Sequence, residues 1–390
     1  MTTPIRHVTL CAVLALTPLM GAAESLYTQW ENGPPTDEDF FPVGVWLQNP
    51  ARAEEYRDAG INIYVGLWQG PTEEQLDALA EAGMYVICHQ NETALNHPRN
   101  DIIIAWLQQD EPDNAQALPE GGYGPPVPPR EIVERYEAMR EADPTRPVHL
   151  NLGQGVAWDG WHGRGVRTNH PEDYPEYIQG CDIVSFDIYP VANSREPVQG
   201  NLWRVARGVE RLVRWSEPHQ PVWSFVEASG IHTGRTATPA QIKTQIWMSL
   251  IHGSTGILYF VHEWEPAFNE AAMLSNEETL AGVTAINEQL HELAPVLNSP
   301  TVEGRLEAVT EDEDVPVAAM LKEHEGDAYV FAVVMRDRPA AAAFTVTGLS
   351  DGTEVHVTET GETLTTEGGA FTEALDGYET RLYRIPGGAS

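Results

Sequence analysis

The sequence predicts an α/β fold, a (β/α)8 TIM barrel followed by a small C-terminal antiparallel β-sandwich. Eight apolar, strand-like runs alternate with helical patterns between Pro42 and Leu293. The runs are continuously apolar, which is typical of parallel strands buried on both faces. After Pro300 the chain changes to short alternating runs separated by turn residues, a pattern that indicates paired antiparallel sheets. For the first part, a doubly wound sheet is the alternative.

The eight predicted strands have aliphatic centres, and polar residues lie at or just after the ends of most of them. They are Pro42–Leu47, Ile61–Leu67, Tyr85–His89, Ile102–Gln108, Pro147–Leu152, Ile183–Tyr189, Pro221–Val226 and Gly256–Val261. The helical patterns between them are Ala51–Ala59, Thr72–Ala82, Arg130–Ala142, Gly200–Ser216, Pro239–Ile251 and Glu277–Leu293. Thr72 and Thr238 stand where a helix N-cap is expected, and Pro239 fits the first helical position. The segment between the third and fourth strands is too short for a good helix.

Seven shorter runs predict the strands of the C-terminal sandwich. They are Arg305–Val309, Val317–Leu321, Ala328–Met335, Ala343–Val346, Glu354–Thr358, Ala370–Leu375 and Thr380–Tyr383. Turn residues such as Glu325-Gly326-Asp327 separate them. We therefore expect three parts: a signal peptide over residues 1–23, a catalytic barrel over 24–299 and a sandwich over 300–390.

The composition excludes several kinds of partner. Of the 390 residues, 42% are hydrophobic and 21% are charged, which is ordinary for a globular protein. The formal net charge of −35 argues against nucleic acid and an anionic membrane surface as partners. Cys88 and Cys181 fall in or beside predicted strands, so we expect buried thiols rather than a disulfide.

The first residues have the pattern of a secretory signal peptide. Arg6 supplies a positive charge, Val8–Leu19 is mostly apolar, and Gly21-Ala22-Ala23 offers small residues for cleavage. The apolar run is shorter than the roughly 20 residues that a membrane-spanning helix needs. We expect a secreted or periplasmic protein with no membrane contact after cleavage. An uncleaved anchor is the alternative.

Two glutamates indicate the chemistry. Glu111 follows the fourth predicted strand and Glu227 follows the seventh. In an eightfold barrel the catalytic residues lie at the carboxyl ends of the strands. Glycosidic cleavage uses one carboxyl group to protonate the leaving oxygen and another to attack the anomeric carbon or activate water. The pair therefore predicts a glycosidase, although either glutamate alone fits a structural role equally well.

Aromatic residues at strand ends and in long loops fit a sugar site. Their flat faces can stack on the apolar faces of sugars. The candidates for substrate binding are Trp46, Trp68, Trp158, Trp161, Tyr189 and Trp264, together with His232 five residues after Glu227. Core packing is the alternative for each tryptophan, and a surface position is the alternative for His232.

These features resemble those of the clan A retaining glycoside hydrolases, which are (β/α)8 barrels. The resemblance covers residues 40–295 and implies that Glu111 is the acid/base and Glu227 the nucleophile. It also implies that Tyr189 hydrogen-bonds the nucleophile and that Trp264 lies beneath the reactive sugar. A trailing β-sandwich is common in this clan.

Asp110 departs from the pattern of that clan, which usually has asparagine directly before the acid/base glutamate. An ionised aspartate accepts hydrogen bonds but cannot donate them, so the contact with the sugar 2-hydroxyl is in doubt. Repulsion between neighbouring carboxylates would raise the pKa of Glu111, which suits a general acid.

Four arginines lie in loops on the predicted active face, Arg164, Arg167, Arg195 and Arg235. Salt bridging to local acids is the favoured interpretation, and binding of a uronate or sulfate group is the alternative. We expect no cofactor and no metal, since a metal-dependent barrel typically has His-x-His after its first strand, where this chain has Trp46-Leu47-Gln48.

The sequence thus predicts a secreted retaining glycoside hydrolase acting on an oligosaccharide or polysaccharide. Two long loops, Pro112–Pro129 and Leu152–Gln179, are expected to shape the substrate cleft. A polysaccharide lyase, a carbohydrate-binding barrel without activity and a metal-dependent hydrolase are the alternatives. The oligomeric state and the identity of the sugar stay open.

Overall fold

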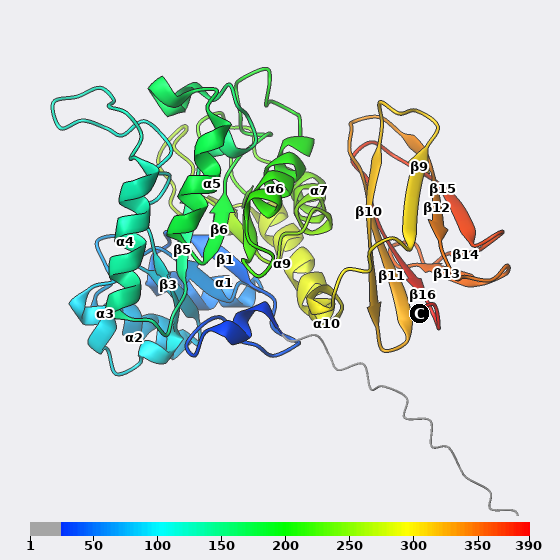
Figure 1. Cartoon of the computed structure of the whole chain (residues 1–390), viewed down its shortest axis with the longest axis horizontal. Helices are drawn as coiled ribbons and strands as arrows, with labels where there is room; N and C mark the ends of the chain where they lie inside the picture. The colour runs from blue at the N-terminus through cyan, green and yellow to red at the C-terminus, as the bar shows by residue number, and fades with distance from the viewer. Residues whose placement is uncertain (1–24) are drawn as a thin grey trace, which may run out of the picture.

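A closed barrel and a β-sandwich lie side by side in the computed structural model, which describes residues 25–390 (Figure 1). The predicted signal peptide of residues 1–23 lies outside the described residues. Between Ser25 and Ser390, no helix is long and apolar enough to cross a membrane.

The barrel is made of eight parallel strands, and all eight predicted strands are confirmed. They are β1 Val43–Trp46, β2 Ile63–Val65, β3 Tyr85–Cys88, β4 Ile103–Leu107, β5 Val148–Leu152, β6 Ile183–Phe186, β7 Val222–Glu227 and β8 Ile257–Phe260. The sheet closes because β1 pairs in parallel with both β2 and β8. Closure is incompatible with the doubly wound alternative, whose sheet is open.

Helices surround the barrel and begin where the sequence supplies caps. They are α1 Ala53–Asp58, α2 Glu73–Ala82, α3 Glu92–Asn96, α4 Pro129–Ala142, α5 Tyr174–Tyr177, α6 Trp203–Trp215, α7 Pro239–Ile251, α8 Ala272–Ser275, α9 Glu277–Glu292 and α10 Ala294–Asn298. Thr72 and Thr238 form capping boxes with Gln75 and Gln241. The long segment after β5 is not irregular, because it forms the short turns η4 Gln154–Val156, η5 His162–Arg167, η6 Pro171–Asp173 and η7 Ile178–Gly180.

The C-terminal part packs a five-stranded sheet, in the order β10-β11-β16-β13-β14, with a three-stranded sheet, β15-β12-β9. The strands are β9 Leu306–Thr310, β10 Val317–His324, β11 Asp327–Val334, β12 Ala340–Val346, β13 Glu354–Val357, β14 Thr363–Thr365, β15 Ala370–Leu375 and β16 Thr380–Ile385. Phe344, Phe371 and Tyr383 stack at the centre of its core. The seven predicted strands are confirmed, while β14 was missed because it is three residues long and mostly threonine.

Specific contacts fasten the sandwich to the barrel. Trp247 of α7 stacks on Phe331 of β11 with ring centroids 5.0 Å apart. The Tyr378 hydroxyl donates to Gly200 O at 2.8 Å and accepts from Leu202 N at 3.3 Å, which pins the chain just before α6. The sandwich therefore supports the end of the loop that joins β6 to α6.

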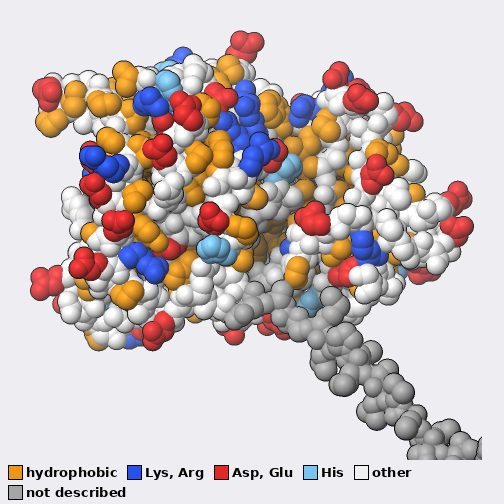
Figure 2. All heavy atoms as spheres, in the orientation of Figure 1, with side chains coloured by type: hydrophobic (Ala, Val, Ile, Leu, Met, Phe, Trp, Pro, Cys, Tyr) orange, Lys and Arg blue, Asp and Glu red, His pale blue; other side chains and the backbone are white. Residues whose placement is uncertain are grey.

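The surface is mainly acidic. Figure 2 shows acidic side chains spread over both parts, while the largest group of basic side chains on this face gathers over α6, which carries Arg204, Arg207, Arg211 and Arg214. Cys88 and Cys181 are buried and free, as expected.

Candidate active site

A cavity of about 390 Å³ opens at the carboxyl ends of the barrel strands. Its walls come from the end of β1 and from the loops after β4, β5, β6, β7 and β8. A volume of this size suits one or two sugar rings, since small-molecule sites typically measure about 300–1,000 Å³. The position is where barrel enzymes carry out their chemistry.

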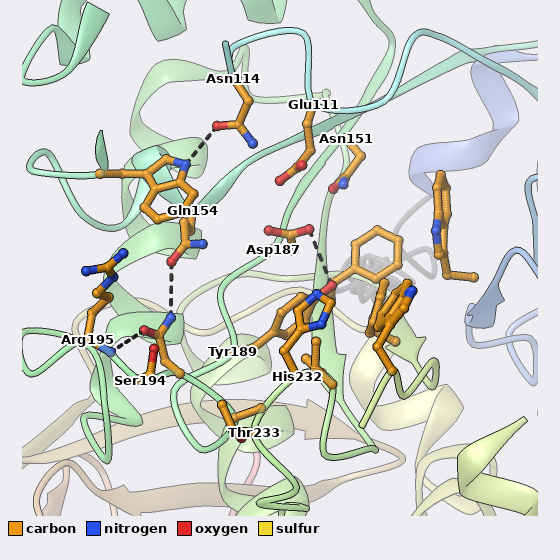
Figure 3. Close-up of a pocket in the computed structure, with 18 of the residues that line it drawn as sticks. Glu111, Asn114, Asn151, Gln154, Asp187, Tyr189, Ser194, Arg195, His232 and Thr233 are labelled. Carbon is orange, nitrogen blue, oxygen red and sulfur yellow. Dashed lines mark hydrogen bonds between the residues drawn. The ribbon is translucent and has the colours of Figure 1, made fainter. Parts of the chain in front are cut away.

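Glu111 and Asp187 face each other in this cavity. Glu111 follows β4 and Asp187 follows β6, and only β5 separates these strands in the barrel. Their carboxyl groups point toward one another (Figure 3), and each changes the pKa of the other. The Tyr189 hydroxyl donates to Asp187 Oδ2 at 3.3 Å. Asp187 was missed from the sequence as a site residue, although it ends a buried strand as Glu111 does.

The backbone around Glu111 is shaped to present its side chain. Glu111 has φ of 41°, in the left-handed region that non-glycine residues rarely adopt. Its N–H donates to Asn151 O at 3.0 Å, which fixes the strained residue to β5. A Cβ on Gly153 would lie 2.8 Å from Glu111 Oε1, so only glycine leaves room for the carboxyl group. Backbone strain held in this way is concentrated at functional sites.

Burial and mutual repulsion change the proton affinity of the pair. Burial, followed by repulsion from Asp187, Asp110 and Asp113, raises the pKa of Glu111 well above its usual range. Burial also raises the pKa of Asp187, but hydrogen bonds with Glu111 and Tyr189 oppose this rise. Both carboxyl groups therefore hold a proton more tightly than a free acid, with the pKa of Asp187 raised to about 8. The hydrogen bond from Tyr189 favours negative charge on Asp187 rather than on Glu111.

Asp110 lies in the same cavity and is held by a polar network inside the barrel. Asn151 Nδ2 donates to Asp110 Oδ1 at 3.0 Å, and Ser185 donates to Asn151 Oδ1 at 2.9 Å. Solvent reaches Asp110 from the cavity while protein surrounds it elsewhere, and this burial raises its pKa to about 6. Asp110 thus presents a fixed hydrogen-bond acceptor beside the Glu111–Asp187 pair.

Glu227 does not line this cavity, and the structure does not bring it together with Glu111 there. Its side chain is 0% exposed. The carboxyl oxygens accept hydrogen bonds from Val191 N at 2.8 Å and Ala192 N at 2.7 Å. Glu227 thus anchors the start of the β6–α6 loop, and its role as nucleophile stays a prediction. Tyr189 likewise contacts Asp187 rather than Glu227.

Replacing Glu227 by alanine should mainly destabilise the protein. The variant leaves the N–H groups of Val191 and Ala192 without an acceptor, and each such group costs about 1–3 kcal/mol. We expect the free energy of unfolding to fall by about 2–6 kcal/mol in urea titrations followed by tryptophan fluorescence. Glu227→Gln, which keeps one acceptor oxygen, should lose less.

The stability of the wild type should also depend on pH through Glu227. Burial raises its pKa from 4.5 to about 7, so between these values the folded protein holds a proton that the unfolded chain has released. Stability should therefore decrease as the pH rises from about 4.5 to about 7, and this contribution should be absent from Glu227→Gln. An identical pH dependence in both proteins would contradict the assignment.

Most of the expected aromatic contacts do line the cavity. Trp46, Trp161, Tyr189, Trp264 and His232 all contribute to its walls. Trp264 stacks with Phe260 at 21° between planes, and its ring centroid lies 4.7 Å from that of His232. Trp158 and Trp68 are the exceptions. Trp158 packs beside the hydrophobic core under the β5–α5 loop. It supports Trp161, whose ring centroid is 5.9 Å away.

Trp68 lies in a second cavity of about 920 Å³ that adjoins the first through Trp264. Trp68 is 68% exposed, which is unusual for so large an apolar side chain, and Phe268 in the same cavity is 61% exposed. Trp264 contributes to the walls of both cavities.

Three of the four loop arginines make contacts within the protein. Arg164 and Arg167 both bond Asp173, as the salt-bridge interpretation expects. Arg235 donates to the carbonyl oxygens of Val191 and Asn193. Arg195 lines the cavity. Among residues 25–390, no group of three or more His, Cys, Asp or Glu side chains is arranged to hold a metal ion.

Known structures share this architecture. AmyP in complex with maltose has a TM-score of 0.53 at 10% identity, covering 94% of this chain and 99% of that one. The α-amylase from Geobacillus thermoleovorans complexed with acarbose has a TM-score of 0.52 at 11% identity, covering 89% and 98%. An α-amylase from Lactobacillus plantarum has a TM-score of 0.51 at 14% identity, covering 89% and 99%.

These similarities establish the class of fold. The chain has the (β/α)8 barrel and trailing β-domain found in glycoside hydrolases, in agreement with the resemblance seen in the sequence. No protein-family model matches the chain, and no curated protein sequence matches it.

Proposed function

We propose that this protein is a glycoside hydrolase that cleaves an oligosaccharide or polysaccharide, with Glu111 as acid/base and Asp187 as nucleophile. The facing pair of carboxyl groups in the strand-end cavity carries this proposal. Glycosidases require one protonated and one ionised carboxyl group at the same bond. The environment of Glu111 favours its protonated form, and Tyr189 stabilises the ionised form of Asp187.

The reaction proceeds in two displacements. Asp187 attacks the anomeric carbon and forms a glycosyl-enzyme ester, while Glu111 transfers its proton to the departing glycosidic oxygen. Glu111, now ionised, removes a proton from water, and the resulting oxygen nucleophile breaks the ester and releases the sugar.

The closeness of the two carboxyl groups favours retention of configuration. Inverting enzymes separate their carboxyl groups by about 6.5–9.5 Å to admit a water molecule, whereas retaining enzymes separate them by about 5–5.5 Å. Glu111 and Asp187 face each other in one cavity and each changes the pKa of the other, which favours the shorter of these separations. The expected retaining mechanism is therefore kept in the proposal, with Asp187 in the role first expected of Glu227.

The similar structures support a glycan substrate, since AmyP is in complex with maltose and the Geobacillus enzyme is complexed with acarbose. The apolar segment Val8–Leu19 supports a secreted or periplasmic location as part of the same proposal. N-terminal sequencing of the exported chain tests this location.

The activity is tested by incubating the purified protein with a panel of neutral and acidic glycans and measuring new reducing ends. Asp187→Asn serves as the blank. The proposal expects reducing ends with at least one glycan, formed with retained anomeric configuration by NMR. Products that absorb near 232 nm as unsaturated sugars would identify a lyase instead. Binding without products would identify a carbohydrate-binding barrel.

Removing Trp68 should weaken the binding of long substrates only. Stacking of a sugar on an exposed aromatic ring contributes about 1 kcal/mol, so Trp68→Ala should raise KM for long glycans by about 3- to 10-fold. We expect little change in kcat, because Trp68 lies outside the cavity that holds Glu111. The measurement compares KM for a disaccharide and a hexasaccharide of the same linkage. An equal change for both lengths would contradict a remote binding site.

A further inference from the structure

Arg195 has no internal partner for its charge. Within residues 25–390, every other Lys or Arg side chain has a carboxylate or a backbone carbonyl oxygen as partner. The guanidinium of Arg195 meets only His162 Nε2, at 3.4 Å. Such a cation is unexpected in a chain with a net charge of −35, where acids are plentiful.

The charge of Arg195 lies at the candidate active site, because the residue lines the same cavity as Glu111 and Asp187. Figure 3 shows its side chain on the same side of the cavity as Gln154, away from Tyr189 and His232. Neutral residues lie on this side as well. Asn193 Nδ2 donates to Gln154 Oε1 at 3.2 Å, and Ser194 also lines the cavity. The cavity therefore has an acidic side, where the carboxyl groups lie, and a basic side with hydrogen-bond donors.

The loop that carries Arg195 is held rigidly in place. Arg195 N donates to Asn193 Oδ1 at 2.9 Å, and Arg235 donates to the carbonyl oxygens of Val191 and Asn193. Glu227 fixes the start of the same loop. These contacts hold the backbone and leave the guanidinium free for a ligand. A charged group held at the edge of a reaction site is suited to orienting a substrate rather than to stabilising the fold.

We propose that Arg195, with His162 beside it, binds a carboxylate or sulfate group on the substrate, so that the enzyme acts on an anionic glycan. This rests on the proposed glycosidase function and names its substrate class. Arginine forms paired, charge-assisted hydrogen bonds with both groups. The cation also offsets the repulsion that an anionic chain meets in approaching this acidic protein.

The test compares each glycan with a neutralised copy of itself. Oligogalacturonate and alginate oligosaccharides are paired with their carboxyl-reduced forms, and sulfated carrageenan oligosaccharides with desulfated forms. The wild type should show at least a tenfold higher kcat/KM for one anionic member, and the pair concerned identifies carboxylate or sulfate. Arg195→Ala should raise KM for that member by about 10- to 100-fold and change KM for the neutral member much less.

Arg338→Ala is the matched control, because it removes the same charge from an exposed residue of the sandwich that pairs with Asp312. It should behave as the wild type. Equal kcat/KM for anionic and neutral members, or a preference that survives in Arg195→Ala, would overturn the proposal.

Binding separates this proposal from the proposed function. Affinity electrophoresis of the wild type, Arg195→Ala and Arg338→Ala in gels that contain pectin, alginate or carrageenan needs no turnover. Retardation of the wild type and Arg338→Ala, lost in Arg195→Ala, would support the anion site even if no glycan is cleaved. Equal mobility of all three proteins in every gel would overturn it.

Discussion

Asp187→Asn should reduce kcat by about 10³-fold or more while leaving the fold unchanged. The asparagine side chain has nearly the same shape and still accepts the hydrogen bond from Tyr189, but it cannot form the glycosyl-enzyme ester. The measurement is steady-state hydrolysis of the best glycan, with circular dichroism to confirm folding.

Glu227→Gln is the matched control for this variant, since it also changes a buried carboxylate to an amide at a strand end. It should retain at least about a tenth of wild-type turnover, because Glu227 acts through the β6–α6 loop and does not face the cavity. The reverse result, an active Asp187→Asn and an inactive but folded Glu227→Gln, would restore Glu227 as the nucleophile and remove Asp187 from the mechanism.

Glu111→Gln should slow hydrolysis by about 10²–10⁴-fold for natural glycans, whose leaving alcohols need protonation. The loss should be much smaller for a dinitrophenyl glycoside, whose leaving group departs without a proton. Glu111→Ala should recover turnover of the same activated substrate when azide is added, because azide replaces the water that Glu111 deprotonates. A similar loss with every leaving group would contradict the role of Glu111 as general acid.

The pH profile provides a second readout of Glu111. Because burial and neighbouring acids raise its pKa, Glu111 keeps its proton through the acidic range, and activity should fall as the pH rises above that pKa. This alkaline limb should disappear in Glu111→Gln when the activated substrate is used. The acidic limb, which reports ionisation of Asp187, should persist.

The barrel could be predicted from the sequence because each of its strands can be recognised from its own run of residues. Buried parallel strands such as Ile103–Leu107 are apolar throughout, and their spacing by helical patterns follows from the repeating unit. The β14 strand Thr363–Thr365 gave no such signal, because a short edge strand of polar residues resembles a turn.

The sequence located part of the cavity, and the residue that it did not single out was Asp187. Asp187 and Glu227 both end apolar strands, so the sequence alone does not separate them. What separates them is the loop Val191–Ala192, whose N–H groups fold back over Glu227 and leave Asp187 facing Glu111. Such a contact joins residues 35 positions apart and depends on the folded loop. The resemblance to a clan with a strand-seven nucleophile also directed attention to Glu227 rather than to Asp187.

The pairing of charged side chains also could not be predicted fully from the sequence. The sequence identified four loop arginines but could not say which lacked a partner. Arg164 and Arg167 pair with Asp173, which is close to them in the sequence. Arg195 instead lies on the side of the cavity where Gln154 and Asn193, two neutral residues, hydrogen-bond to each other. Whether an arginine lacks a charged partner depends on how the loops pack in the folded protein.

The β6–α6 loop is clamped at both ends, by Glu227 at Val191 and Ala192, and by Tyr378 of the sandwich at Gly200 and Leu202. Because these contacts order the loop when the protein folds, a ligand that binds Arg195 does not have to supply the free energy of ordering it. The C-terminal sandwich therefore supports the loop that carries Arg195, although it contributes no residue to the cavity. A loop grafted from another barrel to change specificity would need to carry its own attachment to Tyr378 and Glu227.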